Sequence, residues 1–169
     1  EAGAATPLDE IEALLEANGQ QLAFEPPDYG ALLGTGKRGT LGGAIACNLS
    51  GPRRLKAGAA RDHVLGFSGV NGKGDIYKAG GRVVKNVTGF DLSKLMAGSY
   101  GTLTAMTRIA VKVLPAAEHE ETLALEPASD ALAMEAMSLS LQSACEVSCA
   151  AHVDGQTLLR LEGSLISIA

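Results

Sequence analysis

The order of apolar and polar residues predicts a helix at the start of the chain. Apolar residues recur at positions 8, 11, 14 and 15, so they lie on one face of a helix. We expect Thr6 to be the N-cap and Pro7 the first helical residue, because proline fits a position whose backbone N–H has no helical partner. Asn18 and Gly19 are expected to end this helix.

A hairpin is predicted in the middle of the chain. Residues 63–70 have the pattern of a strand, 71–74 form a turn rich in glycine and asparagine, and 75–78 return as a second strand. A short helix is expected over 41–49, behind a glycine-rich loop.

Another helix and a long strand follow the hairpin. Asp91 is expected to cap a helix over 92–97, and Gly98 to close it. From Thr102 onward, apolar residues alternate with polar ones, which predicts a strand that Pro115 ends.

The pattern changes near residue 116, where we place a domain boundary. The remainder is acidic and rich in alanine, and it predicts a strand over 122–125, a helix over 129–141, and strands over 147–153 and 157–161. The order β-α-β-β is typical of the opening of an α+β domain with an antiparallel sheet. The expected domains are therefore 1–115 and 116–169.

Charge is distributed unevenly along the chain. Residues 37–112 hold 13 of the 14 Lys and Arg residues and only three acids, so this segment carries +10 while the rest carries −15. Most of the glycines lie in the same part of the chain. We expect Gly42 and Gly43 to present free N–H groups at a helix start, which suits an anionic ligand. The alternative to an anion site is a loop-rich fold whose lysines are solvated and bind no ligand.

Several function classes lack support in the sequence. Residues 34–39 match Gly-x-Gly-x-x-Gly, but no clear strand precedes them and no βαβ order follows, as a dinucleotide-binding Rossmann unit requires. A Walker A loop is absent. Aromatic residues make up 4% of the chain and tryptophan is absent, so we expect no nucleic-acid partner.

No catalytic side chain can be named from the sequence. The three histidines, His63, His119 and His152, fall in separate predicted elements. Cys145, Cys149 and His152 are the best metal-ligand candidates, but positions 149 and 152 point to opposite faces of a strand, so no metal site is expected. This pattern suits a protein whose bound cofactor does the chemistry.

The sequence shows no membrane-spanning segment. No apolar run approaches the ~20 residues that cross a bilayer. We therefore expect a cytoplasmic protein, peripheral to a membrane only through partners. Both ends have the character of internal sequence, so we expect a fragment of a longer polypeptide.

Three stretches together resemble one known family. They are Thr-Leu-Gly-Gly at 40–43 with Leu-Ser-Gly-Pro-Arg-Arg at 49–54, Gly-Ala-Ala-Arg-Asp-His-Val-Leu-Gly at 58–66, and Lys-Asn-Val-Thr-Gly-Phe-Asp at 85–91 with Gly-Ser-Tyr-Gly-Thr-Leu at 98–103. In this order they are similar to the FAD-binding domain of the vanillyl-alcohol oxidase type, also called the PCMH type. The resemblance is strongest to the FAD-binding subunits of bacterial glycolate oxidases.

The resemblance implies a set of FAD-contacting residues. Thr40, Gly42 and Gly43 match a loop at the pyrophosphate and ribityl chain. The remaining implied contacts are Ser50, Gly51, Arg54, Arg61, Asp62, Gly98, Ser99, Gly101, Thr102 and Leu103. Asp62 has two possible uses, accepting from a cofactor hydroxyl or capping a turn. Many relatives carry Glu where this chain has Tyr100.

The resemblance also implies the fold class and the function. The fold is α+β: the second FAD-binding subdomain over 1–115, mainly antiparallel sheet with flanking helices, without the first phosphate-loop subdomain, then the start of a truncated α+β cap domain over 116–169. The implied activity is oxidation of glycolate to glyoxylate, with a second flavoprotein subunit and an iron–sulfur subunit as partners. A non-catalytic scaffold subunit of the same complex is the alternative. We expect the fragment alone to bind FAD weakly.

Overall fold

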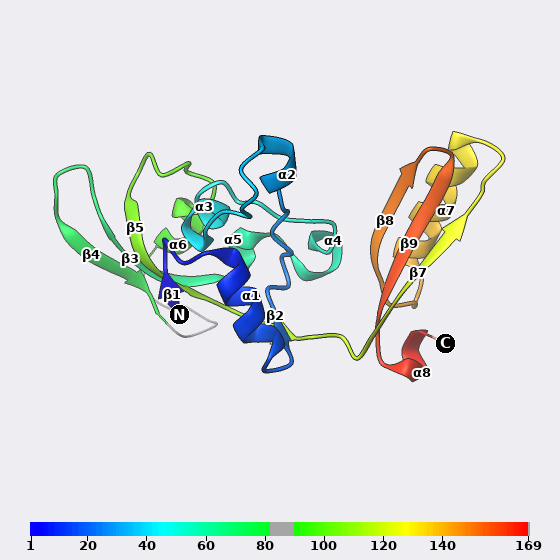
Figure 1. Cartoon of the computed structure of the whole chain (residues 1–169), viewed down its shortest axis with the longest axis horizontal. Coiled ribbons are helices and arrows are strands. Elements are labelled where there is room, and N and C mark those ends of the chain that lie inside the picture. Colours follow the sequence, from blue (N-terminus) through cyan, green and yellow to red (C-terminus); the bar gives the residue numbers. More distant parts are fainter. Residues whose placement is uncertain (82–89, 169) are drawn as a thin grey trace. The chain divides into compact units, whose positions relative to one another are not determined.

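The computed structural model describes residues 1–81 and 90–168 and divides the chain into two compact units (Figure 1). The first unit is Glu1–Pro115 and the second is Ala116–Ala169. Each unit combines helices with antiparallel strands, so the predicted α+β class is confirmed.

A four-stranded antiparallel sheet forms the base of the first unit. Its order is β1 (Ala2–Gly3), β5 (Ala105–Val111), β3 (Val64–Val70) and β4 (Ile76–Gly80). Strands β3 and β4 make the predicted hairpin, with Val70 opposite Ile76. The Asn71 side chain holds the turn, because its Oδ1 accepts from the amides of Lys73 and Asp75 at 2.8 and 3.0 Å.

Short helices and a second, two-stranded sheet surround this base. The helices are α1 (Leu8–Glu16), α2 (Gly30–Leu33), α3 (Leu41–Ala46), α4 (Arg54–Ala57), α5 (Ala60–His63) and α6 (Leu92–Met96). Strands β2 (Gln20–Gln21) and β6 (Leu114–Pro115) pair with each other. As predicted, the Asp91 carboxylate caps α6 by accepting from the Lys94 amide.

The core of the first unit lies where α1 and α3 meet the sheet. Leu8, Phe24, Leu41, Ile45 and Ile109 are almost completely buried there. His63 is buried beside them, with its ring 5.7 Å from that of Phe24 and its Nε2 2.9 Å from the Ala57 carbonyl oxygen. Its contacts are therefore those of a core residue.

Backbone pairing between residues 6–8 and 39–41 changes the start of α1. Its N-cap is Pro7, without a side-chain cap, so the prediction that Thr6 caps the helix is wrong. The Leu8 amide donates to the Gly39 carbonyl at 3.1 Å, and the Leu41 amide donates to the Thr6 carbonyl at 3.0 Å. This long-range pairing supplies the partner that a threonine hydroxyl would otherwise provide.

Two other boundaries differ from the sequence-based expectation. Strand β5 begins at Ala105 because residues before it form a turn, in which the Thr102 amide donates to the Ser99 carbonyl and Gly101 has a φ of 71°. Pro115 does not lie beyond the strands, since it pairs with Gln20 in the small sheet.

The second unit has the predicted β-α-β-β order. It consists of β7 (His119–Leu125), α7 (Asp130–Gln142), β8 (Val147–Val153) and β9 (Gln156–Gly163), followed by α8 (Leu165–Ile168). The sheet order is β7-β9-β8, all antiparallel. All seven residues of β7, a strand at the sheet edge, are exposed. Within 1–81 and 90–168, no helix is long and apolar enough to cross a bilayer.

Gly42 and Gly43 provide a matched test of the packing of α3. A Cβ at Gly42 would lie 2.8 Å from the Ala4 carbonyl oxygen, whereas a Cβ at Gly43 would meet only the Thr40 hydroxyl, at 3.4 Å. We expect Gly42→Ala to lower the free energy of unfolding by about 1–3 kcal/mol through overpacking. Gly43→Ala should raise it by about 0.5–1 kcal/mol, because alanine favours a helix. Denaturant unfolding measures both values, and equal changes would contradict this packing.

Candidate cofactor site

A largely apolar cavity of about 400 Å³ lies beside α3 in the first unit. Its wall includes Leu8 at the start of α1, and Gly43, Ala44 and Cys47 on one side of α3. A volume of this size is typical of pockets that hold small molecules and cofactors. Gly43 exposes bare backbone to the cavity, so a ligand can approach α3 closely there.

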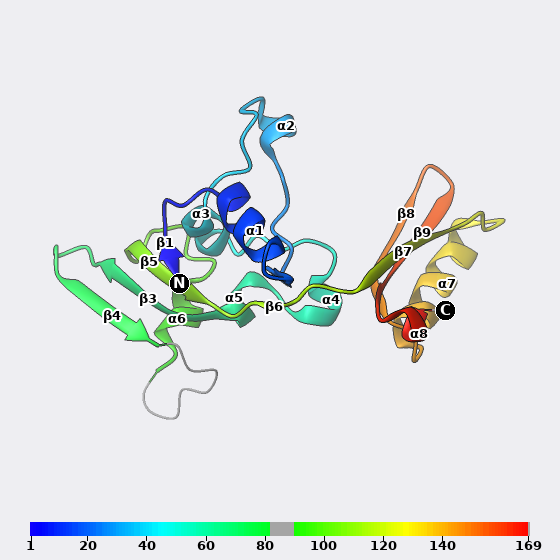
Figure 2. The ribbon, with the colours of Figure 1, turned by 60° about the horizontal axis from the view of Figure 1, so that its bottom comes forward.

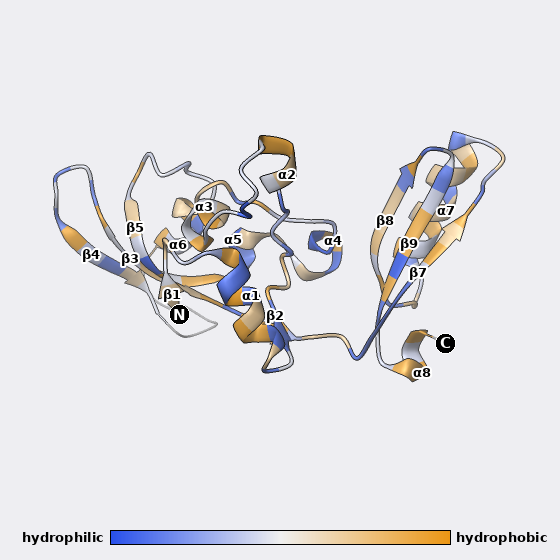
Figure 3. Ribbon diagram, in the orientation of Figure 1, coloured by the Kyte–Doolittle hydropathy of each residue, from blue (hydrophilic) through white to orange (hydrophobic). Residues whose placement is uncertain are grey.

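The opposite wall of the cavity is the loop 26–39, which we name the strap. Tyr29, Leu33, Thr35 and Lys37 of the strap line the cavity. Helix α2 forms the tip of the strap, and Figure 3 shows this helix as largely hydrophobic. The sequence-based expectation described this segment only as a glycine-rich loop and did not include α2.

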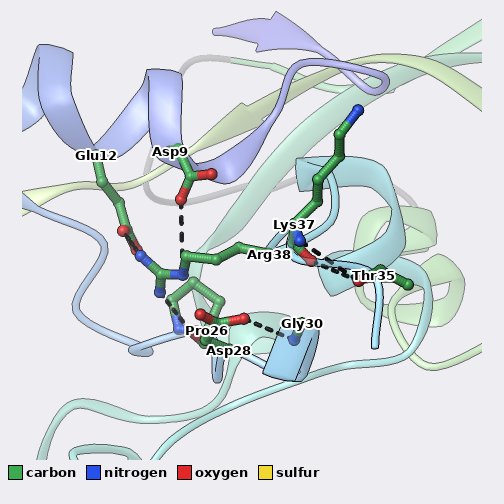
Figure 4. Close-up of polar contacts among 8 residues, drawn as sticks. All are labelled: Asp9, Glu12, Pro26, Asp28, Gly30, Thr35, Lys37 and Arg38. Carbon is green, nitrogen blue, oxygen red and sulfur yellow. Dashed lines mark hydrogen bonds and ion pairs between the residues drawn. The ribbon is translucent and has the colours of Figure 1, made fainter. Parts of the chain in front are cut away.

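Arg38 joins the two ends of the strap to α1 (Figure 4). Its guanidinium pairs with the Glu12 carboxylate and lies 3.9 Å from a carboxylate oxygen of Asp9. An NH2 group of the same side chain donates to the Pro26 carbonyl at 3.0 Å. The charge of Arg38 is therefore already balanced within the protein.

The first amides of α3 are not free. The Gly42 amide donates to the Ala4 carbonyl at 2.7 Å, and the Gly43 amide donates to the Thr40 hydroxyl at 3.2 Å. The Leu41 amide is bonded to the Thr6 carbonyl. The prediction that Gly42 and Gly43 present free N–H groups to an anion is therefore wrong, because the N-terminal segment and the Thr40 cap use these donors. Contact of Thr40, Gly42 and Gly43 with FAD stays a prediction.

The predicted loop 98–103 lies at the other end of α3. The Gly98 amide donates to the Ile45 carbonyl at 3.1 Å, and the Tyr100 amide donates to the Ala46 carbonyl at 2.8 Å. Tyr100 has a φ of 55°, a backbone conformation that is costly for a bulky residue. This residue is also 74% exposed. Helix α3 thus connects the predicted site residues at 40–43 with those at 98–103.

The remaining members of this loop have local partners. The Thr102 hydroxyl donates to the Ser99 carbonyl at 2.7 Å, and Leu103 is about half exposed. The Ser99 hydroxyl is buried without a hydrogen-bond partner among the described residues. Gly98 and Gly101 have φ values of 84° and 71°, so glycine is required there by the backbone.

Ser50, Arg61 and Asp62 lie in a network that supports α5. The Ser50 hydroxyl accepts from the Ala60 amide at 2.8 Å, and the Asn48 side chain accepts from the Arg61 amide at 2.9 Å. Asp62 accepts from the Ala59 amide at 2.9 Å. Of the two uses expected for Asp62, the structure shows the capping of a turn.

Gly51 and Arg54 have different environments. Gly51 is buried against Glu25, and a Cβ there would collide with the Glu25 carbonyl oxygen. The close approach that this glycine permits is to protein backbone. Arg54 is exposed on α4.

Sequence reasoning missed several residues of the cavity wall: Leu8, Tyr29, Leu33, Lys37, Cys47 and Leu49. Leu8 was assigned only to the apolar face of the first helix. One usable signal was present, since Leu32 and Leu33 interrupt an otherwise glycine-rich loop. In the part of the chain that the structure describes, no group of three or more His, Cys, Asp or Glu side chains could hold a metal ion.

Comparison with known proteins agrees with the sequence resemblance. The chain is 43% identical over 158 residues to glycolate oxidase subunit GlcE of Escherichia coli, a match that covers 94% of this chain and 43% of that protein. It is 42% identical to glycolate oxidase subunit GlcD of Bacillus subtilis, over 69% of this chain and 23% of that protein. The chain therefore spans less than half the length of these two relatives.

A more distant relative and a solved structure extend the comparison. The chain is 35% identical to a D-lactate dehydrogenase of Archaeoglobus fulgidus, over 73% of this chain and 26% of that protein. A crystal structure of alkyldihydroxyacetonephosphate synthase has the same fold, with a TM-score of 0.68 at 18% identity, covering 94% of this chain and 34% of that one. Residues 1–80 match the family described as "FAD binding domain". Nearly the whole chain is therefore similar to a glycolate oxidase subunit, and its first 80 residues are similar to an FAD binding domain.

Proposed function

We propose that this chain forms one wall of an FAD site in an enzyme that oxidises a short 2-hydroxy acid. The single observation that supports this most is the apolar cavity beside α3, within the region that matches an FAD binding domain. The chemistry that FAD supplies when bound is the acceptance of two electrons from the substrate. The residues of this chain bind and orient the cofactor and shield it from solvent.

The cavity suits the flavin ring better than it suits the pyrophosphate. Its wall is largely apolar and Gly43 allows a flat ring to approach the helix backbone. The first amides of α3 are engaged within the protein and so are not donors for phosphate. Lys37, at the cavity, is the cation that we assign to the phosphate-bearing part of the cofactor.

The names of the relatives support the substrate class. Glycolate and D-lactate, which appear in the names of three of them, are both short 2-hydroxy acids. We assign the oxidation of glycolate to glyoxylate, because the match to the glycolate oxidase subunit covers most of this chain. The proposed partners are a second flavoprotein subunit and an iron–sulfur subunit, with the assembly located in the cytoplasm.

One observation favours a second candidate, a scaffold subunit of the same complex without catalysis of its own. Among the residues that the structure describes, those that line the cavity include no histidine, aspartate or glutamate, and hence no carboxylate or imidazole that could take a proton from the substrate. In this case a partner subunit would carry out the oxidation.

A flavin spectrum separates these two candidates. We expect the intact protein, purified without its partners, to be yellow and to show the visible absorbance band of an oxidised flavin. Adding glycolate anaerobically should bleach this band. A protein that is colourless, or yellow but unchanged by glycolate, would contradict catalysis by this subunit and favour the scaffold.

The position of the ring is tested by filling the cavity at Gly43. We expect Gly43→Leu to weaken FAD binding by about tenfold or more, because its side chain occupies space beside α3 that the ligand needs. Gly72→Leu is the control, since Gly72 lies in the hairpin turn with no atom near its Cβ position. Titration of the apoprotein with FAD, followed by flavin fluorescence, gives both affinities. Equal affinities for the two variants would place the ring elsewhere.

A further inference from the structure

The strap is a cavity wall with little support behind it. Figures 1 and 2 both show α2 at the tip of a loop that stands away from α1 and α3. Tyr29 and Leu33 line the cavity but are 43% and 69% exposed, and the adjacent Leu32 is 81% exposed. Large apolar side chains that remain this exposed are stabilised when they close onto a ligand.

The tip of the strap is held together by its own contacts. The Gly30 amide donates to the Asp28 carboxylate at 2.7 Å, and the Thr35 amide donates to the Gly30 carbonyl at 3.0 Å. A Cβ at Gly30 would lie 2.8 Å from the Lys37 carbonyl oxygen, so the two arms touch there. These contacts join the two arms, so the amides that make them report any opening of the strap.

The returning arm of the strap is rich in glycine with unusual backbone angles. Gly34, Gly36 and Gly39 have φ values of 66°, 61° and 92°, and no atom lies within 4 Å of the position of a Cβ at any of them. The Gly39 carbonyl accepts from the Leu8 amide, so Gly39 fixes the foot of the strap. Gly34 and Gly36 are suitable hinges, because hinge motion requires a few residues that absorb changes in φ and ψ.

The Arg38 side chain fastens both ends of the strap to α1 (Figure 4). This side chain bridges the Pro26 carbonyl at one end of the strap and Glu12 and Asp9 on α1. Its Nε is buried and has no hydrogen-bond partner among the described residues, because the nearest Asp9 oxygen is 3.9 Å away. A shift of about 1 Å toward α1 would complete this bond.

We propose that the strap is a lid over the cavity and that the contacts of Arg38 with Glu12 and Asp9 are its latch. Closure brings Tyr29 and Leu33 onto the bound ligand and lets Arg38 Nε reach Asp9. Opening at Gly34 and Gly36 lets the ligand leave. The identity of this ligand as FAD rests on the proposed function, whereas the latch itself rests on the contacts of the strap.

Hydrogen exchange of the ligand-free intact protein tests the latch without FAD. Glu12→Gln keeps the size of the side chain but removes its charge. We expect the amides of Leu33, Gly34 and Thr35, which are bonded within the strap, to exchange about fivefold faster, the upper range for a partly exposed ion pair. The control is Lys94→Ala, which breaks a partly exposed ion pair on α6. Exchange in Glu12→Gln that equals that of the parent protein would overturn the latch.

The rate of FAD release tests the lid. Release, followed as recovery of free flavin fluorescence after dilution, should also be about fivefold faster in Glu12→Gln and unchanged in Lys94→Ala. Arg38→Gln and the double variant Glu12→Gln/Arg38→Gln should release FAD at the same rate, because both lack the same pair. Faster exchange with unchanged release would overturn the lid. Faster exchange in a protein that binds no FAD would support the latch and refute the proposed cofactor.

Discussion

Three backbone hydrogen bonds between residues 4–8 and 39–42 hold the first unit together. They connect Leu8 to Gly39, Leu41 to Thr6, and Gly42 to Ala4. Through them the N-terminal segment aligns α1, α3 and the foot of the strap, so the two walls of the cavity face each other. Gly42 is the residue that makes this possible, since a side chain there would push Ala4 away from the helix.

The same bonds decide which ligand groups the site can accept. A glycine pair at a helix start ordinarily offers free amides to phosphate. Here the protein's own backbone and the Thr40 hydroxyl occupy those donors. What remains open is the side of α3 at Gly43, Ala44 and Cys47, which suits an apolar ring.

Two arginines pair with acids inside the protein, which explains part of the basic character of residues 37–112. Arg38 pairs with acids on α1, and Arg53 lies 3.7 Å from a carboxylate oxygen of Glu25. These two arginines stabilise loops. Arg54 on α4 and Arg61 on α5 are exposed, so a ligand or a partner can reach them.

Local signals predicted the elements well, and long-range contacts account for the differences. The hairpin at 71–74, the Asp91 cap of α6 and the β-α-β-β order of the second unit depend on residues close together in sequence. Thr6 was misassigned because its segment pairs with residues some 33 positions further along the chain, as in the bridge between Pro7 and Thr40. The cavity was missed for the same reason, since its walls come from α1, α3 and a loop whose periodicity carries no signal.

Strand β7 has a consequence for the colloidal behaviour of the second unit. A strand at a sheet edge whose residues are all exposed offers its backbone to other chains. Its first half carries Glu120 and Glu121, and charged side chains on an edge strand disfavour pairing with a second copy. The second half, in which Leu123 and Leu125 are about 40% exposed, carries no charged side chain. Self-association of this unit would therefore begin at the apolar end of β7.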